Sequence, residues 1–304
     1  MDSPMTASTF VISITPFDAN GRLDESALRA HLDRMADAGI GVYLGGGGSG
    51  EGFTLSNEES RRVLEIGVDQ IGGRVQVRSM GIEPRTAQQM IDYLKMSAEV
   101  GVDAAQVYSL DPGHGHRPTA PEIEKYLEEV LSSTDLPCVV SSHMSVGYRL
   151  DPSLLHTLSQ KYAHLIGVNC SHPDLAALIA LRSALDERIE LHVGGPAQAL
   201  SALALGATGF LSSEGNLAPQ TCAALIAGAN ANDYETATNA FDAISQLSTL
   251  LYRLGGIRAT KGVLRSLGLP GGHVRPPQLD ADEKSVASVL EFLDSLNFKA
   301  IENW

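Results

Sequence analysis

GVYLGGGGSGEGFTLSNEESRRVLEIGVDQ, residues 41–70, contains one complete unit of strand, loop and helix. The apolar run Val42–Leu44 predicts a short buried strand, and a glycine-rich loop follows it. A helix is predicted from about Asn57 to Gln70. Ser56 is suited to cap its N-terminus, with Glu59 three residues later as the capping-box partner. The segment therefore predicts a βα unit, the building block of parallel α/β folds.

The same alternation recurs along most of the chain. Further strands are predicted at Phe10–Thr15, Val75–Met80, Ala104–Tyr108, Pro137–Ser142, Leu165–Val168, Glu190–Val193 and Gly209–Leu211. Further helices are predicted at Glu25–Ala38, Thr86–Val100, Ala120–Ser132, Pro152–Lys161, Pro173–Ala184, Gln198–Leu205 and Pro219–Ala229. Eight units in one chain favour a closed (β/α)8 TIM barrel of the α/β class over an open sheet.

The alternation stops after the eighth unit. Tyr234–Leu254, Arg258–Leu267 and Asp280–Leu296 predict three helices with no strand between them. We therefore expect a barrel over residues 1–230 and a C-terminal helical extension over residues 231–304.

Composition excludes several classes of protein. The chain has 22 basic and 36 acidic residues and a formal charge of −14, which argues against non-specific binding to nucleic acid. Its three cysteines are far apart and show no CxxC spacing, as expected of a reducing compartment. The N-terminus lacks the pattern of a secretory signal, and no apolar run is long enough to span a membrane. We expect a cytoplasmic protein with no membrane partner.

Four segments carry a resemblance to a known family. They are TPFDANGRLDESAL from Thr15, GGGSGEGFTLSNEE at Gly46–Glu59, GATGFLSSEGNLAP at Gly206–Pro219, and RPP at Arg275–Pro277. Together, and in this order, they resemble the dihydrodipicolinate synthase / N-acetylneuraminate lyase family. The resemblance implies a barrel enzyme, commonly a homodimer or homotetramer, that acts on an α-keto acid through a lysine Schiff base.

One residue departs from that pattern. LIGVNCSHPDL, residues 165–175, is similar to the strand that carries the family's lysine, but Asn169 stands at the lysine position. An amide nitrogen is conjugated to its carbonyl and cannot form a Schiff base. All six lysines fall in predicted helices or near helix ends, away from the strand ends where barrel active sites are built. The chain is therefore predicted to be a divergent member of the family without Schiff-base chemistry.

The glycine-rich loop is the first candidate binding element. It lacks the lysine of a P-loop, so nucleotide binding is not indicated. The resemblance implies that this loop binds a substrate carboxylate, with Gly48 and Ser49 standing where the family has two threonines. The alternative is a tight βα turn with no binding role.

Histidines near the predicted strand ends form the second candidate group. His114 and His116 follow the fourth strand, His143 the fifth and His172 the sixth. Three interpretations stay open. They are acid–base catalysis by His143 or a neighbour, a divalent-metal site, and loop histidines bonded to solvent or backbone.

Arg78 lies inside the third predicted strand, where a charge needs a partner. It would either grip an anionic substrate in the barrel mouth or pair with an acid on a helix.

These observations lead to one predicted site. His143 and Asn169 are the candidate catalytic residues, and the candidate substrate-binding residues are Gly48, Ser49, Glu51, Ser142 and Asp111. No metal is assigned. The predicted function is a lyase-like enzyme that acts on a small carboxylate or keto acid by aldol cleavage, condensation, hydration or dehydration. The alternatives are a non-catalytic carboxylate-binding or regulatory paralogue, and a metal-assisted lyase that uses the histidines named above.

Overall fold

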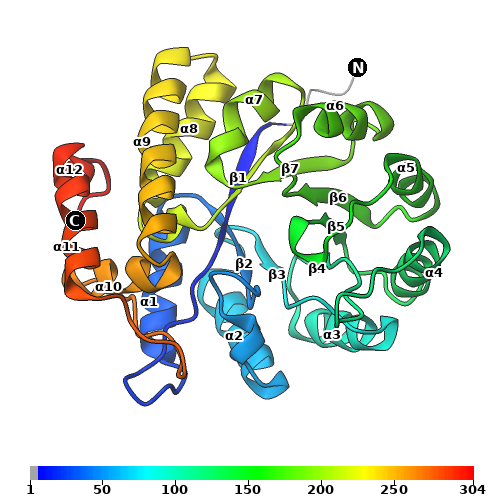
Figure 1. Ribbon diagram of the computed structural model, residues 1–304, viewed down its shortest axis with the longest axis horizontal. Coiled ribbons are helices and arrows are strands. Elements are labelled where there is room, and N and C mark those ends of the chain that lie inside the picture. The colour runs from blue at the N-terminus through cyan, green and yellow to red at the C-terminus, as the bar shows by residue number, and fades with distance from the viewer. Residues whose placement is uncertain (1–5) are drawn as a thin grey trace.

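The computed structural model describes residues 6–304 and contains a closed barrel of eight parallel strands (Figure 1). Each strand pairs with its neighbours in chain order, and β8 closes the ring by pairing with β1. The strands are β1 (Ser8–Ile12), β2 (Gly41–Leu44), β3 (Val77–Ser79), β4 (Ala104–Val107), β5 (Cys138–Ser142), β6 (Leu165–Cys170), β7 (Glu190–Gly194) and β8 (Gly209–Ser212). The predicted (β/α)8 barrel is confirmed.

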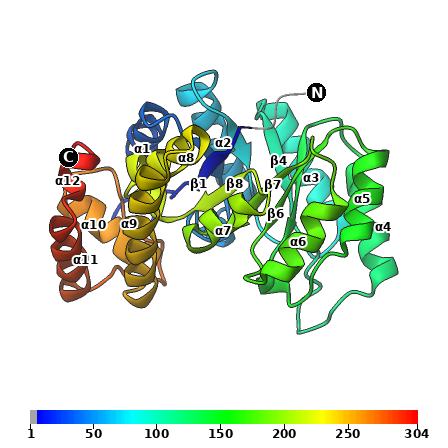
Figure 2. The same cartoon turned by 90° about the horizontal axis from the view of Figure 1, so that it is seen from above.

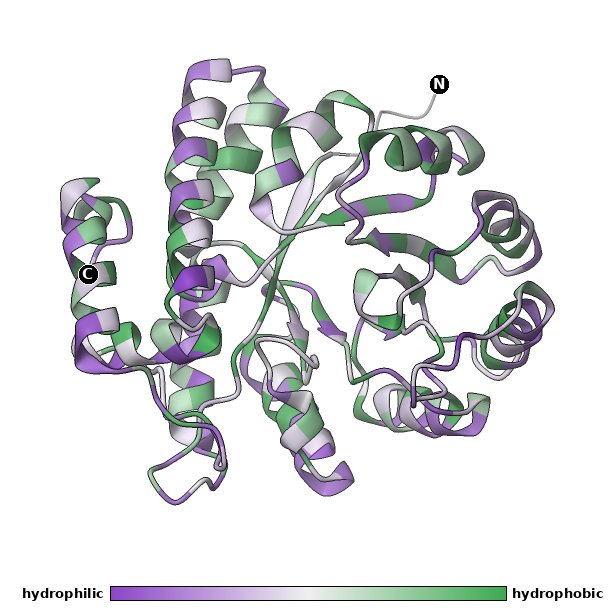
Figure 3. Ribbon diagram, viewed as in Figure 1, coloured by the Kyte–Doolittle hydropathy of each residue, from purple (hydrophilic) through white to green (hydrophobic). Residues whose placement is uncertain are grey.

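Helices surround the barrel, one after each strand (Figure 1). They are α1 (Glu25–Asp37), α2 (Asn57–Ile71), α3 (Ala87–Val100), α4 (Ala120–Leu131), α5 (Pro152–Lys161), α6 (Leu175–Ala184), α7 (Ala199–Ala204) and α8 (Pro219–Ala231). Apolar residues of these helices pack against the strands and form the core, and Figure 3 shows hydrophilic and hydrophobic residues mixed along most of the helices. Among residues 6–304, no helix has the length and apolar character needed to cross a membrane.

Local capping sets where several helices begin. The capping box of α2 is present: the Ser56 hydroxyl accepts from the Glu59 N–H at 3.2 Å, and the Glu59 carboxylate accepts from the Ser56 N–H at 3.0 Å. The helix expected from Pro173 begins instead at Leu175, because the Asp174 carboxylate accepts from the N–H groups of Ala176 and Ala177.

The C-terminal extension consists of α9 (Tyr234–Arg253), α10 (Ile257–Ser266), α11 (Glu283–Ser295) and the unpredicted short α12 (Phe298–Ile301). Helix α9 packs along α8, and α10 to α12 lie beyond it at one side of the barrel (Figure 2). Its connection to the barrel is also electrostatic: Lys261 of α10 is fully buried and lies 2.7 Å from a Glu51 carboxylate oxygen. The extension therefore supports the loop that follows β2.

Candidate active site

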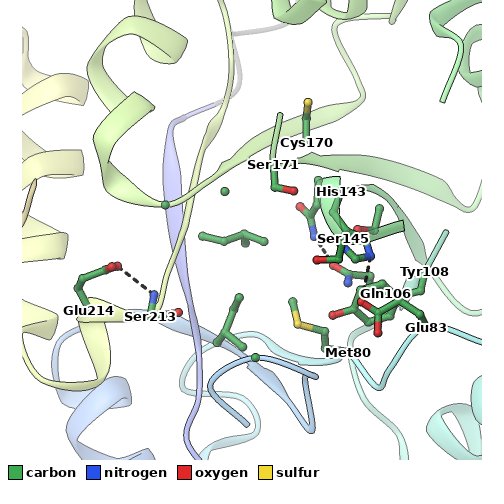
Figure 4. A pocket seen from close by; sticks show the side chains of 17 residues that line it. Met80, Glu83, Gln106, Tyr108, His143, Ser145, Cys170, Ser171, Ser213 and Glu214 are labelled. Carbon is green, nitrogen blue, oxygen red and sulfur yellow. Dashed lines mark hydrogen bonds and ion pairs between the residues drawn. The ribbon is translucent and has the colours of Figure 1, made fainter. Parts of the chain in front are cut away.

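A cavity of about 300 Å³ opens at the C-terminal ends of the strands (Figure 4). Its polar side chains include Glu83, Gln106, His143, Asn169, Ser213 and Glu214. In the close view, Glu83, Tyr108 and His143 lie on one side and Glu214 on the other. Three of the seven predicted site residues, Gly48, His143 and Asn169, line this cavity. Ser49, Glu51, Ser142 and Asp111 are not among its lining residues.

Asn169 lies near the end of β6 and is 4% exposed. Its Nδ2 is 3.2 Å from the Tyr43 hydroxyl on β2 and 2.7 Å from the Gln106 side-chain oxygen on β4. Its other amide atom, Oδ1, is buried and has no hydrogen-bond partner among the described residues. The three side chains come from even-numbered strands, as expected of one interior layer of a barrel. One end of the Asn169 amide is therefore held by two hydrogen bonds, whereas the other end has no hydrogen-bond partner in the described protein.

His143 follows β5 and meets a carboxylate that we did not predict. Its Nε2 lies 3.1 Å from a carboxylate oxygen of Glu83, in the loop after β3, which is ion-pair distance without the alignment of a hydrogen bond (Figure 4). The imidazole packs edge-on against the ring of Tyr108, with ring centroids 5.2 Å apart. The neighbouring His143 holds the pKa of Glu83 below its usual range, against the opposing effect of burial. An ionised carboxylate beside an imidazole is a common acid–base arrangement.

Glu51 takes a structural position. Its backbone is left-handed, with φ of 50°, and its carboxylate lies against Lys261 and Gln278 of the C-terminal region. Lys261 also donates to the carbonyls of Thr15 and His273. Burial lowers the pKa of Lys261, and the charge of Glu51 opposes this effect. In the described part of the chain no lysine lines the cavity.

The glycine-rich loop borders the cavity at Gly48. Ser49 lies behind it and donates through its hydroxyl to Ser213 in the loop after β8, at 2.7 Å. Within residues 6–304 the N–H groups of Gly48 and Ser49 have no protein acceptor. Free N–H groups in a glycine-rich turn are suited to an anion such as a carboxylate.

Ser142 and Asp111 are both engaged locally. The Ser142 hydroxyl lies 3.3 Å from Nε2 of His172 and accepts from the Leu150 N–H. Asp111 forms an ion pair with Arg85 at 2.6 Å. These contacts hold the loops around the cavity in place.

The remaining histidines do not gather at one point. His114 and His116 are exposed in the loop after β4, whereas His172 is buried beside Ser142. His192 is buried inside the barrel and lies 3.0 Å from the Ser8 hydroxyl. Across residues 6–304, no group of three or more His, Cys, Asp or Glu side chains is arranged to hold a metal ion. The metal interpretation therefore lacks a ligand set.

Arg78 points into the barrel interior, below the cavity. Its guanidinium forms two contacts with Glu190, at 2.7 and 3.0 Å. Because β3 and β7 are not neighbours, this pair crosses the interior. Neither interpretation of Arg78 is correct, since its partner belongs to a strand and the residue does not line the cavity.

Comparison with known proteins identifies the family that the chain matches. A family model described as the dihydrodipicolinate synthetase family matches residues 5–296. A 4-hydroxy-tetrahydrodipicolinate synthase of Phenylobacterium zucineum is 29% identical over 293 residues, which cover 95% of this chain and 97% of that protein. One of Methanocaldococcus jannaschii is 28% identical over 272 residues, 89% of this chain and 92% of that protein. A crystal structure of a dihydrodipicolinate synthase has a TM-score of 0.87 and 25% identity, and the match covers 96% of this chain and 99% of that chain.

Proposed function

Because the chain belongs to the dihydrodipicolinate synthetase family and has Asn169 where we expect the family's lysine, we propose a lyase-like enzyme without a Schiff base. Its substrate would be a small carboxylate that carries a keto or hydroxyl group. The observation that carries this proposal is the contact between His143 and Glu83, at 3.1 Å, in the cavity that Asn169 also lines.

In aldol cleavage, His143 would take the proton of the substrate hydroxyl as the carbon–carbon bond breaks. The bonding electrons would then move onto the carbonyl oxygen of the keto fragment and form an enolate. A lysine iminium would serve as the electron sink in a Schiff-base enzyme. Here the enolate oxygen needs hydrogen-bond donors instead, and the amide of Asn169 is the candidate. The ionised Glu83 would stabilise the protonated imidazole that forms.

The carboxylate of the substrate has a separate place in this scheme. The cavity lining includes Glu83 and Glu214 but, among the described residues, no arginine or lysine. The Glu214 carboxylate is already engaged, since it accepts from the hydroxyls of Ser212 and Ser248 and from the Ser213 N–H. The free N–H of Gly48, which lines the cavity, together with that of the adjacent Ser49, is therefore the expected anion site.

A thermal-shift screen of small keto and hydroxy acids would first find a ligand, because selective binding stabilises the native state. Turnover of that ligand is then followed by NMR in the wild type and in His143→Gln and Glu83→Gln variants. His143→Gln should lower kcat by about 10²- to 10⁴-fold, the usual contribution of a general acid or base. His116→Gln, which alters an exposed loop histidine, is the matched control and should keep full activity.

Two results would overturn the proposal. A borohydride-trapped adduct with pyruvate, detected by mass spectrometry, would show that a Schiff base forms after all. Binding with no turnover of any ligand would favour the non-catalytic carboxylate-binding or regulatory paralogue. The protein is also proposed to be a homodimer or homotetramer, which light scattering in solution would establish.

A further inference from the structure

The hydroxyl of Tyr43 connects the interior ion pair to the site. Tyr43 is completely buried, and its oxygen lies 3.3 Å from Nη1 of Arg78 and 3.2 Å from Nδ2 of Asn169. Arg78 can only donate, so it uses one lone pair of the Tyr43 oxygen. The proton of Tyr43 therefore needs an acceptor elsewhere.

Two buried groups are left unsatisfied if Asn169 Nδ2 also donates to Tyr43. One is the Tyr43 proton, for which no acceptor is present among the described residues, and the other is Oδ1 of Asn169. The two ends of a side-chain amide have nearly the same shape, so the hydrogen-bond network decides which end faces which way. Rotating the amides of Asn169 and Gln106 together by half a turn lowers the number of unsatisfied buried groups.

After that turn, Asn169 Oδ1 accepts the Tyr43 proton at 3.2 Å and a Gln106 N–H at 2.7 Å. Of the Tyr43 proton and the two amide atoms of Asn169, only Nδ2 then lacks a partner among the described residues. Unsatisfied buried polar groups are costly, so the turned arrangement is favoured.

The geometry points to Arg78 and Tyr43 as positioning residues that hold the Asn169 amide with its N–H groups free for a substrate oxygen. This inference rests on the proposed function and makes it more specific, because an enolate oxygen needs a donor. The two contacts with Glu190 hold the guanidinium of Arg78 in one orientation. Arg78 then donates to one lone pair of the Tyr43 oxygen, which directs the Tyr43 proton toward Asn169. That proton selects the orientation of the Asn169 amide. Asn169 alone would touch the substrate.

Neutron diffraction from crystals of the deuterated protein tests this directly, because deuterium and oxygen positions are both visible. In the wild type we expect the two Nδ2 deuterons on the side of Asn169 away from Tyr43, and the Tyr43 deuteron directed at Oδ1. Tyr43→Phe removes the proton that selects this orientation, so both orientations should be populated. Tyr148→Phe removes a hydroxyl bonded to the Leu110 carbonyl and should leave Asn169 unchanged.

A wild-type structure with Nδ2 directed at Tyr43 would overturn the inference. An unchanged single orientation in Tyr43→Phe would overturn the role of Tyr43. Neither readout depends on turnover, so failure here is distinguishable from failure of the proposed function, which the His143 variant tests.

Discussion

Arg78 at the lower end of the barrel interior is buried and fully paired, whereas Asn169 at the mouth is buried and keeps one amide atom unbonded. The guanidinium has Glu190, Gln76 and Tyr43 as acceptors, and it also stacks over the ring of Phe10 at 4.1 Å. The same barrel can therefore satisfy a full charge in its interior. Asn169 differs from Arg78 in that it lines the cavity, where a bound ligand would be able to supply the missing partner.

Removing the partner of Arg78 should produce the largest effect. Glu190→Leu leaves a buried guanidinium without its counter-charge, and we expect a loss of about 3–5 kcal/mol in the free energy of unfolding, measured with urea. Glu99→Leu, which removes the partner of Arg61 on the exposed helix surface, should change stability far less. Equal losses in the two variants would contradict the structural role of the interior pair.

The prediction of the fold from the sequence succeeded for local reasons. Strand and helix periodicities, and signals such as Ser56 with Glu59, depend on residues close together in the chain. Asn169 and His143 line the cavity, and this location follows from their positions near the ends of predicted strands; their catalytic roles stay predictions.

The remaining contacts of the site depend on pairings between distant segments. Glu83 was missed because it lies in irregular chain beyond β3, although its place after a strand end was a usable signal. Glu51 was assigned to the substrate because its partner, Lys261, is 210 residues away on a helix. The contact of Asn169 with Tyr43 and Gln106 requires the register of three separate strands, which composition and periodicity do not determine.

Lowering the pH should destabilise the protein through His192, which is buried in the barrel interior below the cavity. Burial lowers the pKa of His192 to about 4, whereas the unfolded chain titrates near the ordinary value of 6.5. Between these values the unfolded state binds more protons, so stability is full above pH 6.5 and falls as the pH drops toward 4. The loss from this group is roughly 3 kcal/mol by pH 4. Urea unfolding from pH 7 to pH 4 should show a shallower decline in His192→Gln, and an identical decline would contradict the assignment.

Substitutions at two glycines of the loop after β2 should have different effects, one on stability and the other on ligand affinity. A Cβ at Gly52 would lie 2.1 Å from the Gly45 carbonyl oxygen, whereas a Cβ at Gly48 would meet no atom within 4 Å. We expect Gly52→Ala to cost roughly 2–3 kcal/mol and Gly48→Ala to stay within about 0.5 kcal/mol. Thermal unfolding measures both. Gly48→Ala should still change the affinity for the ligand found in the screen, and an unchanged affinity would argue against a binding role for Gly48.

The smallest expected effect concerns the Ser49 hydroxyl, which connects the loop after β2 to the loop after β8 through its hydrogen bond to Ser213. Ser49→Ala removes the hydrogen bond to Ser213, and we expect a loss of about 0.5–1 kcal/mol, because Ser213 is exposed and can bond to water instead. Ser133→Ala removes a 2.7 Å hydrogen bond to the Val130 carbonyl, far from the cavity, and is the control. Calorimetric titration should show weaker ligand binding in Ser49→Ala alone, because its loop carries the free N–H groups of Gly48 and Ser49. Equal affinity in both variants would mean that the loop holds its position without this bond.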